Sequence, residues 1–348
     1  IYYFYDFSSS TSKSALHVYN CDFTNGDARI DGGAIKISIQ NGEPSIEINK
    51  CTFNSNSADQ GGSISYSFHP ASSLSTLLET TNDGTNFVLH VIDCTFENNT
   101  CRLKGGAVFI SVENDEPSKS IEFSGCTFNK NHGDQDIESE YGGAIYYIFS
   151  SSSSSRSLLE DTNVHAFHAI NCTFTENIAS LYGGAVYISM PNNEPSKPCE
   201  ISNCTFKNNR ADSNEDMNYN SISEGGDIYY IVGSLSSKSK MLAENAISLN
   251  INDCIFTGGY SKDNAGSIMI LITKDGPNRL IEISKCSFND IESKKGCSIY
   301  YDYEPKSSSS SKTLLEGTGG GAENHAFHII DCTFTGKLKV GSYYIDGI

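Results

Sequence analysis

Cys126-Thr127-Phe128 and the later Gly142-Gly143-Ala144-Ile145 decide the fold of this chain of 348 residues, because variants of both motifs recur along it. Nine cysteines are each followed by Phe two residues later, and the steps between these cysteines alternate between 30–32 and 43–50 residues. Self-similarity on this scale indicates stacked units that bury their apolar faces against one another. We call these residues the Cys column: Cys21, Cys51, Cys94, Cys126, Cys172, Cys204, Cys254, Cys286 and Cys332.

Apolar and polar residues alternate on both sides of the motifs. Ile46 and Ile48 precede Cys51 at every second position, and Ile35, Ile37 and Ile39 follow a Gly pair in the same way. This period of two is typical of strands with one buried face, and no helical periodicity is present. The sequence therefore predicts an all-β chain: a parallel β-helix, or solenoid, of about nine coils with three short strands per coil. Parallel crossovers predict a right-handed helix.

We expect one solenoid domain over residues 1–348. Gly pairs such as Gly142-Gly143 mark tight turns, since glycine tolerates positive φ. Alternate coils carry long Ser-rich loops, at 72–79, 151–160, 234–244 and 307–316. The predicted coils are 1–34, 35–63, 64–107, 108–144, 145–185, 186–227, 228–267, 268–298 and 299–342, and 343–348 begin a further coil.

Composition limits the partners. The formal net charge is −18 and there are only five arginines, which argues against nucleic acid or an anionic membrane and suits cations or basic surfaces. No apolar run approaches the ~20 residues of a membrane-spanning helix, so we predict no transmembrane segment. The chain begins with Ile and has no signal peptide, so we expect a mature form or an excised segment.

The cysteines are predicted to be buried thiols. In stacked coils the Cys column would have a spacing of about 4.8 Å, but parallel side chains on in-register strands are poorly placed for a disulfide torsion. Thiols in this position behave as small apolar side chains. Cys101, Cys199 and Cys297 lie outside the column, and the cysteine count does not settle the redox compartment.

A second column is expected on the outer surface. The residue four positions before each column cysteine alternates between His and Glu with one exception, and we call this set the His/Glu column: His17, Glu47, His90, Glu122, His168, Glu200, Asn250, Glu282 and His328. The favoured interpretation is stabilisation between coils. A pH-responsive surface is an alternative, with a modest loss of stability as the pH rises and the histidines lose charge. A zinc site using His165 with His168, or His325 with His328, is another.

Aromatic residues form a third predicted column, following the Gly motif. We call this set the aromatic stripe: Tyr2, Phe109, Tyr146, Tyr187, Tyr229, Tyr300 and Tyr344. Aromatic rows on an outer face can bind sugar rings or a neighbouring molecule. The alternative is intramolecular stacking under the long loops.

Other candidate sites carry weaker signals. Two acidic clusters, Asp134/Asp136/Glu138/Glu140 and Asp212/Glu215/Asp216, offer oxygen ligands for calcium, but neither has a recognised loop spacing, and solvated loops are favoured. Apart from this calcium alternative we expect no cofactor and no metal. Sequons for N-glycosylation occur at Asn98, Asn171 and Asn203.

The alternation of Phe-x-x-Asn, as in Phe53–Asn56 and Phe128–Asn131, with Gly-Gly-Ala-Ile/Val resembles the repeats of the polymorphic membrane protein family. The Asn is missing after Phe256, Phe288 and Phe334. This resemblance runs along nearly the whole chain. It implies a surface-displayed β-helical passenger domain that contacts other surfaces, as many adhesins of that family do.

Repetition also bears on catalysis. An active site would interrupt the repeat once, and the motifs show no such interruption, so we predict that the chain is not an enzyme. Ile1-Tyr2-Tyr3 and Tyr343-Tyr344-Ile345 match the strand at 145–147, so the chain opens and closes within the pattern. We therefore expect an extracellular or cell-surface structural or adhesive solenoid, self-assembling end to end into a filament or forming part of a stalk. A monomeric glycan-binding adhesin is the alternative, and a polysaccharide-active enzyme is less favoured.

Overall fold

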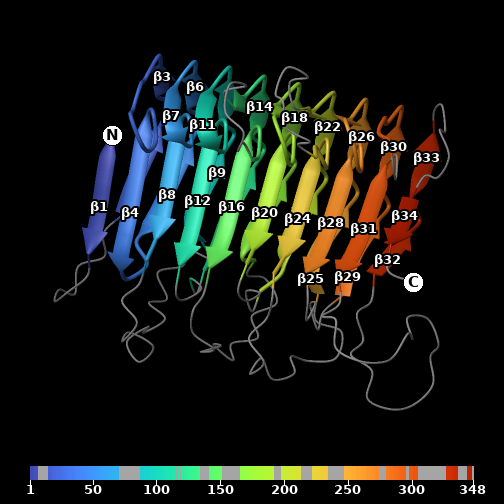
Figure 1. Ribbon diagram of the computed structural model, residues 1–348. Coiled ribbons are helices and arrows are strands. Elements are labelled where there is room, and N and C mark those ends of the chain that lie inside the picture. Colours follow the sequence, from blue (N-terminus) through green and yellow to red (C-terminus); the bar gives the residue numbers. More distant parts are fainter. Residues whose placement is uncertain are drawn as a thin grey trace, which may run out of the picture.

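The protein is a parallel β-solenoid. The computed structural model describes residues 1–6, 15–69, 87–113, 117, 119–133, 141–150, 165–191, 197–212, 222–233, 247–273, 280–294, 298–304, 327–335 and 343–346. In these ranges all secondary structure is β, and the strands of successive coils pair in parallel into four sheets that we name A to D. β1 and β34 lie at opposite ends of the stack (Figure 1). This arrangement confirms the predicted all-β parallel β-helix.

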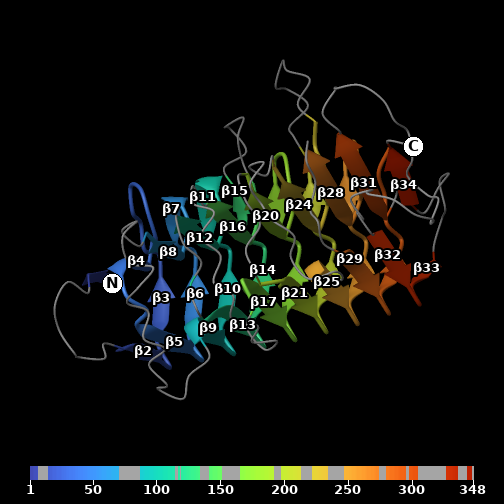
Figure 2. The same cartoon turned by 90° about the horizontal axis from the view of Figure 1, so that it is seen from below.

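Sheets A and B form two of the faces (Figure 2). Sheet A contains β1 (Tyr2–Asp6), β4 (Ile35–Asn41), β8 (Ile64–Phe68), β12 (Val108–Glu113), β16 (Ile145–Ser150), β20 (Val186–Met190), β24 (Ile228–Val232), β28 (Ile268–Thr273), β31 (Ile299–Glu304) and β34 (Tyr343–Asp346). Sheet B contains β2 (Ala15–Tyr19), β5 (Ser45–Asn49), β9 (Phe87–Ile92), β13 (Ser120–Ser124), β17 (Phe167–Ile170), β21 (Cys199–Ser202), β25 (Ile247–Asn252), β29 (Leu280–Ser284) and β32 (Phe327–Ile330).

Sheets C and D have shorter strands. Sheet C contains β3 (Asp22–Thr24), β6 (Thr52–Asn54), β10 (Thr95–Glu97), β14 (Thr127–Asn129), β18 (Thr173–Thr175), β22 (Thr205–Lys207), β26 (Ile255–Thr257), β30 (Ser287–Asn289) and β33 (Thr333–Thr335). Sheet D contains β7 (Ser57–Gln60), β11 (Thr100–Lys104), β15 (His132–Gly133), β19 (Ile178–Ala179), β23 (Arg210–Ala211) and β27 (Tyr260–Ser261).

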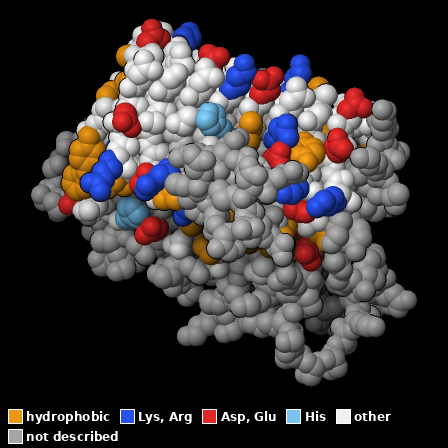
Figure 3. Space-filling view, turned by 45° about the horizontal axis from the view of Figure 1, so that its top comes forward, with side chains coloured by type: hydrophobic (Ala, Val, Ile, Leu, Met, Phe, Trp, Pro, Cys, Tyr) orange, Lys and Arg blue, Asp and Glu red, His pale blue; other side chains and the backbone are white. Residues whose placement is uncertain are grey.

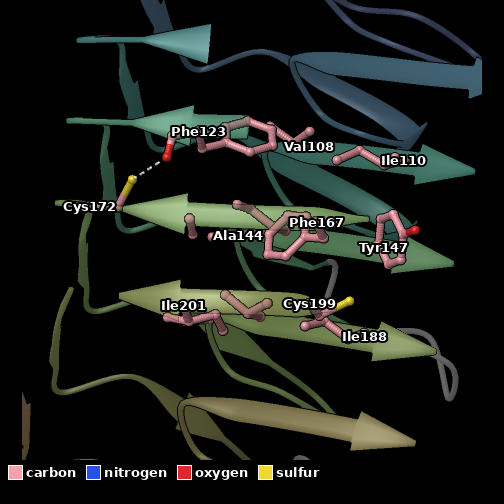
Figure 4. Close-up of a cluster of buried hydrophobic side chains, with 14 of the residues drawn as sticks. Val108, Ile110, Phe123, Ala144, Tyr147, Phe167, Cys172, Ile188, Cys199 and Ile201 are labelled. Carbon is pink, nitrogen blue, oxygen red and sulfur yellow. Dashed lines mark hydrogen bonds between the residues drawn. The ribbon is translucent and has the colours of Figure 1, made fainter. Parts of the chain in front are cut away.

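Equivalent side chains of successive coils lie in columns. Phe96 pairs in register with Phe53 on one side and Phe128 on the other. Along the whole stack the rings of this Phe column lie 4.7–4.9 Å apart between centroids, with interplanar angles of 3–9°. The apolar residues of sheets A, B and C fill the interior, as Figure 4 shows for Val108, Phe123 and Phe167. One continuous core therefore holds the coils together, with each coil buried against its neighbours.

Corners of the coil are made by single residues with positive φ. In one coil these are Asn171 (φ 54°), Glu176 (φ 52°) and Gly183 (φ 65°). The second glycine of the pair has a different role, because a Cβ on Gly184 would lie 2.1 Å from the carbonyl oxygen of Gly226 in the next coil. This confirms the predicted Gly turns: one glycine bends the chain and the other permits close approach of coils.

Sheet D was not predicted. Sheets A, B and C account for the three expected strands per coil, and six coils add a fourth strand of two to five residues. Its inward positions are small residues, such as Ala58, Ala179 and Ala211, and a strand this short has no recognisable periodicity. The Ser-rich loops at 72–79, 151–160, 234–244 and 307–316 lie outside the described residues.

Candidate functional site

The Cys column lies inside the solenoid. Its seven central members, from Cys51 to Cys286, are buried, and all nine are free thiols. The Cys51 thiol donates to the carbonyl oxygens of Asn49 (3.3 Å) and Val18 (3.5 Å), while its backbone N–H donates to Sγ of Cys94 (3.3 Å). Burial raises the pKa of Cys51 to about 11. The thiols of the Cys column therefore fill the interior and form weak hydrogen bonds between neighbouring coils.

Two of the cysteines outside the column are also buried. Cys199 is an inward residue of β21 in the main core, and Cys101 lies on the inner side of β11. Cys297 lies outside the described residues. Figure 4 shows Cys172 hydrogen-bonded to the carbonyl of Phe123, which is the arrangement that repeats along the column.

The His/Glu column is assembled on the outer face of sheet B as predicted. In-register pairs run from His17 and Glu47 to Glu282 and His328 without a shift at these positions. Glu122 is the centre of the best-formed group, with Oε1 3.3 Å from Nε2 of His90 and Oε2 3.0 Å from Nδ1 of His168. Burial raises the pKa of Glu122, but the hydrogen bonds from His168 and His90 prevail and lower it to about 2.

One further histidine joins this group. His165 places Nε2 2.9 Å from Oε2 of Glu200, and its ring lies 4.5 Å from that of His168 between centroids. The hydrogen bond from His165 is the main cause that lowers the pKa of Glu200. Each of the two histidines is thus paired with a carboxylate of a different coil. This geometry favours the interpretation of stabilisation between coils.

Metal ligation has little geometric basis in the described ranges. Among these residues no group of three or more His, Cys, Asp or Glu is arranged to hold a metal ion. The acidic cluster at 134–140, Glu215, Asp216 and His325 lie outside the described residues. Asp212, which is described, pairs with Arg210 at 2.6 Å.

The aromatic stripe lies on the outer face of sheet A but is largely covered. Tyr146 and Tyr187 stack at 4.8 Å, Tyr187 and Tyr229 at 5.2 Å, and Met269 takes the next position in register. Phe109, Tyr300 and these three tyrosines are all less than 9% exposed. Tyr2 is 65% exposed, and Tyr344 continues the register beside Tyr300.

A second aromatic layer contributes to this cover. Tyr141 and Tyr182 stack at 5.5 Å, and the Tyr182 ring lies 4.7 Å from that of Tyr229. Burial raises the pKa of Tyr182 to about 12. Nζ of Lys104 lies 5.1 Å from the centroid of the Tyr146 ring, within cation–π distance. The geometry favours the alternative of intramolecular stacking over an open sugar-binding face.

A buried Asn column is the element that the sequence did not reveal. Its members are 0% exposed: Asn56, Asn99, Asn131, Asn177 and Asn209. Nδ2 of Asn131 donates to the carbonyl of Phe96 in the preceding coil (3.0 Å) and to Oδ1 of Asn177 in the next (3.0 Å). Oδ1 of Asn131 accepts from the backbone N–H and Nδ2 of Asn99. The recurring Phe-x-x-Asn motif was the available signal, but its spacing does not show which way Asn faces.

The Asn column ends after Asn209. After Phe256 the Asn position is Gly259, and Asp227 occupies the position that is Ala or Ser in the coils on either side. The Asp227 carboxylate accepts from Nδ2 of Asn209 at 2.9 Å, and a Cβ on Gly259 would lie 2.5 Å from its other oxygen. Gly259 thus stands where the preceding coils have Asn, and Asp227, 32 residues earlier in the chain, supplies the missing acceptor.

The three sequons lie at exposed corners. Asn98, Asn171 and Asn203 are exposed and have positive φ of 51–54°. Each is next to or near a buried residue of the Asn or Cys column, so its side chain points outward from a fixed backbone. The geometry makes the three amides accessible, and their glycosylation stays a prediction.

Comparisons with known proteins agree with this geometry. The Chlamydia polymorphic membrane protein repeat matches residues 93–111 and 171–189, and each match runs from the corner before a column cysteine into a strand of sheet A. No curated protein and no solved structure gave a match. The described part of the chain has no helix that is long and apolar enough to cross a membrane. The matches confirm the resemblance at these two stretches: within its parallel β-solenoid the chain carries two segments similar to the Chlamydia polymorphic membrane protein repeat.

Proposed function

We propose that the chain is an extracellular or cell-surface β-solenoid with a structural or adhesive role, as a filament subunit or as a segment of a long stalk. The observation that carries this proposal is the in-register parallel stacking of equivalent strands along the described coils. Within the described residues, β1, β2 and β3 at one end of the stack and β34, β32 and β33 at the other have a paired neighbour on one side and a strand edge on the other. Such edges are templates for further strands. The matched repeats support surface display.

The first strand has the geometry that such an extension needs. The carbonyl of Ile1 accepts from the N–H of Lys36 at 2.8 Å, so Ile1, Tyr3 and Tyr5 direct their backbone groups to β4. Backbone groups alternate sides along a strand, and those of Tyr2 and Phe4 therefore point away from β4. The side chains of Tyr2 and Phe4 are 65% and 48% exposed. A parallel strand, from further coils or from a second copy, fits against this edge.

Electron microscopy and sedimentation of the purified chain test self-assembly. Filaments that lengthen with protein concentration support it, while uniform rods about 45 Å long at every concentration, equal to nine coils at about 4.8 Å, contradict it. Phe4→Pro removes a donor that points away from β4, and proline is tolerated on an edge strand. We expect Phe4→Pro to shorten the filaments and Phe4→Ala, which keeps the N–H, to leave them.

We also propose that the chain lacks catalytic activity. The outward polar residues repeat from coil to coil and are paired with one another, as in the His/Glu column. Asp227, at which the Asn column ends, is fully buried and offers no access to a polysaccharide. Release of reducing ends from a panel of polysaccharides would contradict this proposal.

A glycan-binding surface adhesin is the second candidate. The burial of Tyr187 argues against the aromatic stripe as its binding surface. A groove on sheet D favours this candidate instead, and it is described next. A glycan array in which Tyr187→Ala binds as well as the unmodified chain would separate the two surfaces.

A further inference from the structure

A groove crosses the outer face of sheet D in the first four coils. It has a volume of about 420 Å³ and lies over β7, β11 and β15 and the segment 27–29, where Asp27 pairs with Ser57. This volume is within the range of about 300–1,000 Å³ for small-molecule sites. Figure 3 shows the side of the molecule that carries sheets A and D, with basic and acidic side chains interspersed.

The arginines are concentrated on this face. Three of the five arginines are described, and all three, Arg29, Arg102 and Arg210, lie in sheet D or directly beside it. Arg29 and Arg102 line the groove together with His132. The lining also contains Asp27 and Asp59, so its formal charges balance, in a chain with a net charge of −18. Arg29 and Arg102 are the groups in this lining that can bind an anion.

The two groove arginines differ in their partners. Arg102 is held by Asp59, with Nε 2.9 Å from Oδ1 and Nη2 2.9 Å from Oδ2. This two-point contact fixes the guanidinium plane and leaves Nη1 available. Arg29 is exposed and has no ion pair with any other described residue. The groove thus offers one fixed guanidinium and one whose charge is not neutralised by a partner.

The remaining lining suits a polyhydroxylated ring. Ala58 and Cys101 are 7% and 3% exposed and face inward, so the floor between the outward side chains is shallow and is formed by the strands themselves. Thr100 and Asp59 place a hydroxyl and a carboxylate beside it, and both can accept hydrogen bonds from sugar hydroxyls. Convergent polar groups of this kind fix the orientation of a small ligand.

We propose that this groove binds an acidic saccharide, a sugar unit that bears a carboxylate or a sulfate. Arg29 and Arg102 contact the acidic group, which matches the fork geometry of guanidinium. Thr100 and Asp59 contact ring hydroxyls, and the ring lies over Ala58. The inference requires only an accessible outer face, and it is independent of end-to-end assembly, which Phe4→Pro tests separately.

Arg210 supplies a matched control on the same face. Its guanidinium lies 4.8 Å from the centroid of the Tyr260 ring and pairs with Asp212, so it is outside the groove. Arg29→Ala and Arg210→Ala remove the same charge from the same sheet. Binding that depends only on net charge falls equally in both variants, whereas binding in the groove falls only in the first.

Calorimetry and saturation-transfer NMR with a hyaluronan tetrasaccharide and a sulfated heparin disaccharide test the proposal, with chitotetraose and inorganic sulfate as controls. We expect binding of at least one acidic saccharide, about tenfold weaker in Arg29→Ala and changed by less than about twofold in Arg210→Ala. Arg29→Lys should recover part of the affinity. No binding of either acidic saccharide, equal loss in both alanine variants, equal binding of chitotetraose, or equal affinity for sulfate alone would overturn it.

Discussion

Asn209 donates a hydrogen bond from Nδ2 to Oδ1 of Asp227 at 2.9 Å, and both side chains are completely buried. This contact ends the Asn column. In the preceding coils the acceptor comes from the Asn of the next coil, as when Asn177 donates to Asn209 at 3.0 Å. Gly259 provides no such group, so a carboxylate from the same coil as Asn209 replaces it. This contact gives the Asn209 amide an acceptor, but it places the Asp227 carboxyl group in the apolar interior.

Asp227 is expected to make stability depend on pH between about 4 and 7. Burial raises its pKa to about 7, against the hydrogen bond from Asn209 that lowers it. A raised pKa means that the folded state binds the proton more tightly than the unfolded state. The stabilisation is therefore complete below pH 4 and is lost as the pH rises to 7, by up to about 4 kcal/mol.

Asp227→Asn tests this expectation, because it keeps an acceptor for Asn209 and has no charge. We expect its melting temperature to exceed that of the unmodified chain at pH 8 and to change less between pH 4 and 7. Asp253→Asn, an exposed corner position, serves as the control and should keep the original pH profile. Identical profiles for the unmodified chain and Asp227→Asn would contradict the assignment.

Glu122 is expected to make the protein less stable as the pH falls, which is opposite to the effect of Asp227 and occurs at lower pH. Its pKa is lowered to about 2, because hydrogen bonds from His168 and His90 outweigh the effect of burial. A lowered pKa stabilises the fold above about pH 4.5, and this stability is lost as the pH falls towards 2, by about 3 kcal/mol. Thermal unfolding followed by circular dichroism should show this loss, and Glu122→Gln should reduce it. Glu97→Gln, on sheet C, is the matched control and should unfold in acid like the unmodified chain.

Asn131→Ala should be strongly destabilising. The substitution removes four hydrogen bonds and leaves the buried N–H of Asn99 and the carbonyl of Phe96 without their side-chain partner. An unsatisfied buried group costs about 1–3 kcal/mol, so we expect a loss of about 3–5 kcal/mol in urea unfolding. Asn129→Ala removes a half-buried amide that bonds Glu97, and we expect less than about 1 kcal/mol there. Comparable losses in the two variants would argue against the Asn column as a structural device.

The Cys column should resist thiol reagents in the native state. Its members from Cys51 to Cys286 are at most 1% exposed, so the reagent has no access to their sulfur atoms, and burial also raises the pKa of Cys51 to about 11. Brief treatment with iodoacetamide followed by peptide mass spectrometry should label the half-buried Cys21 and Cys332 well before the central members. After denaturation in urea the labelling rates should converge. Early labelling of Cys126 or Cys172 in the native protein would show that the stack opens.

Much of the candidate site could be predicted, but not its accessibility. The spacing placed His90, Glu122 and His168 in one column, because residues at equal positions in stacked coils must be neighbours. It also placed Tyr146 beside Tyr187, yet it gave no sign that both rings are covered. Tyr141 and Tyr182, which precede the Gly pairs and belong to no strand, contribute to this cover.

The recurrence of Cys-x-Phe and Gly-Gly by itself determined the solenoid, because a repeated apolar pattern can be buried only by stacking equivalent strands in register. The sequence also shows that Asn is missing after Phe256, but the tertiary structure alone decided what replaces it. Asp227 contacts Asn209, which lies 18 positions earlier, and packs against Gly259, which lies 32 positions later. Arg29 lines the same groove as Arg102, which lies 73 positions later. Such contacts depend on the length of each coil and on short strands without periodicity. A one-dimensional pattern contains neither the distances nor the solvent exposure that give these side chains their chemistry.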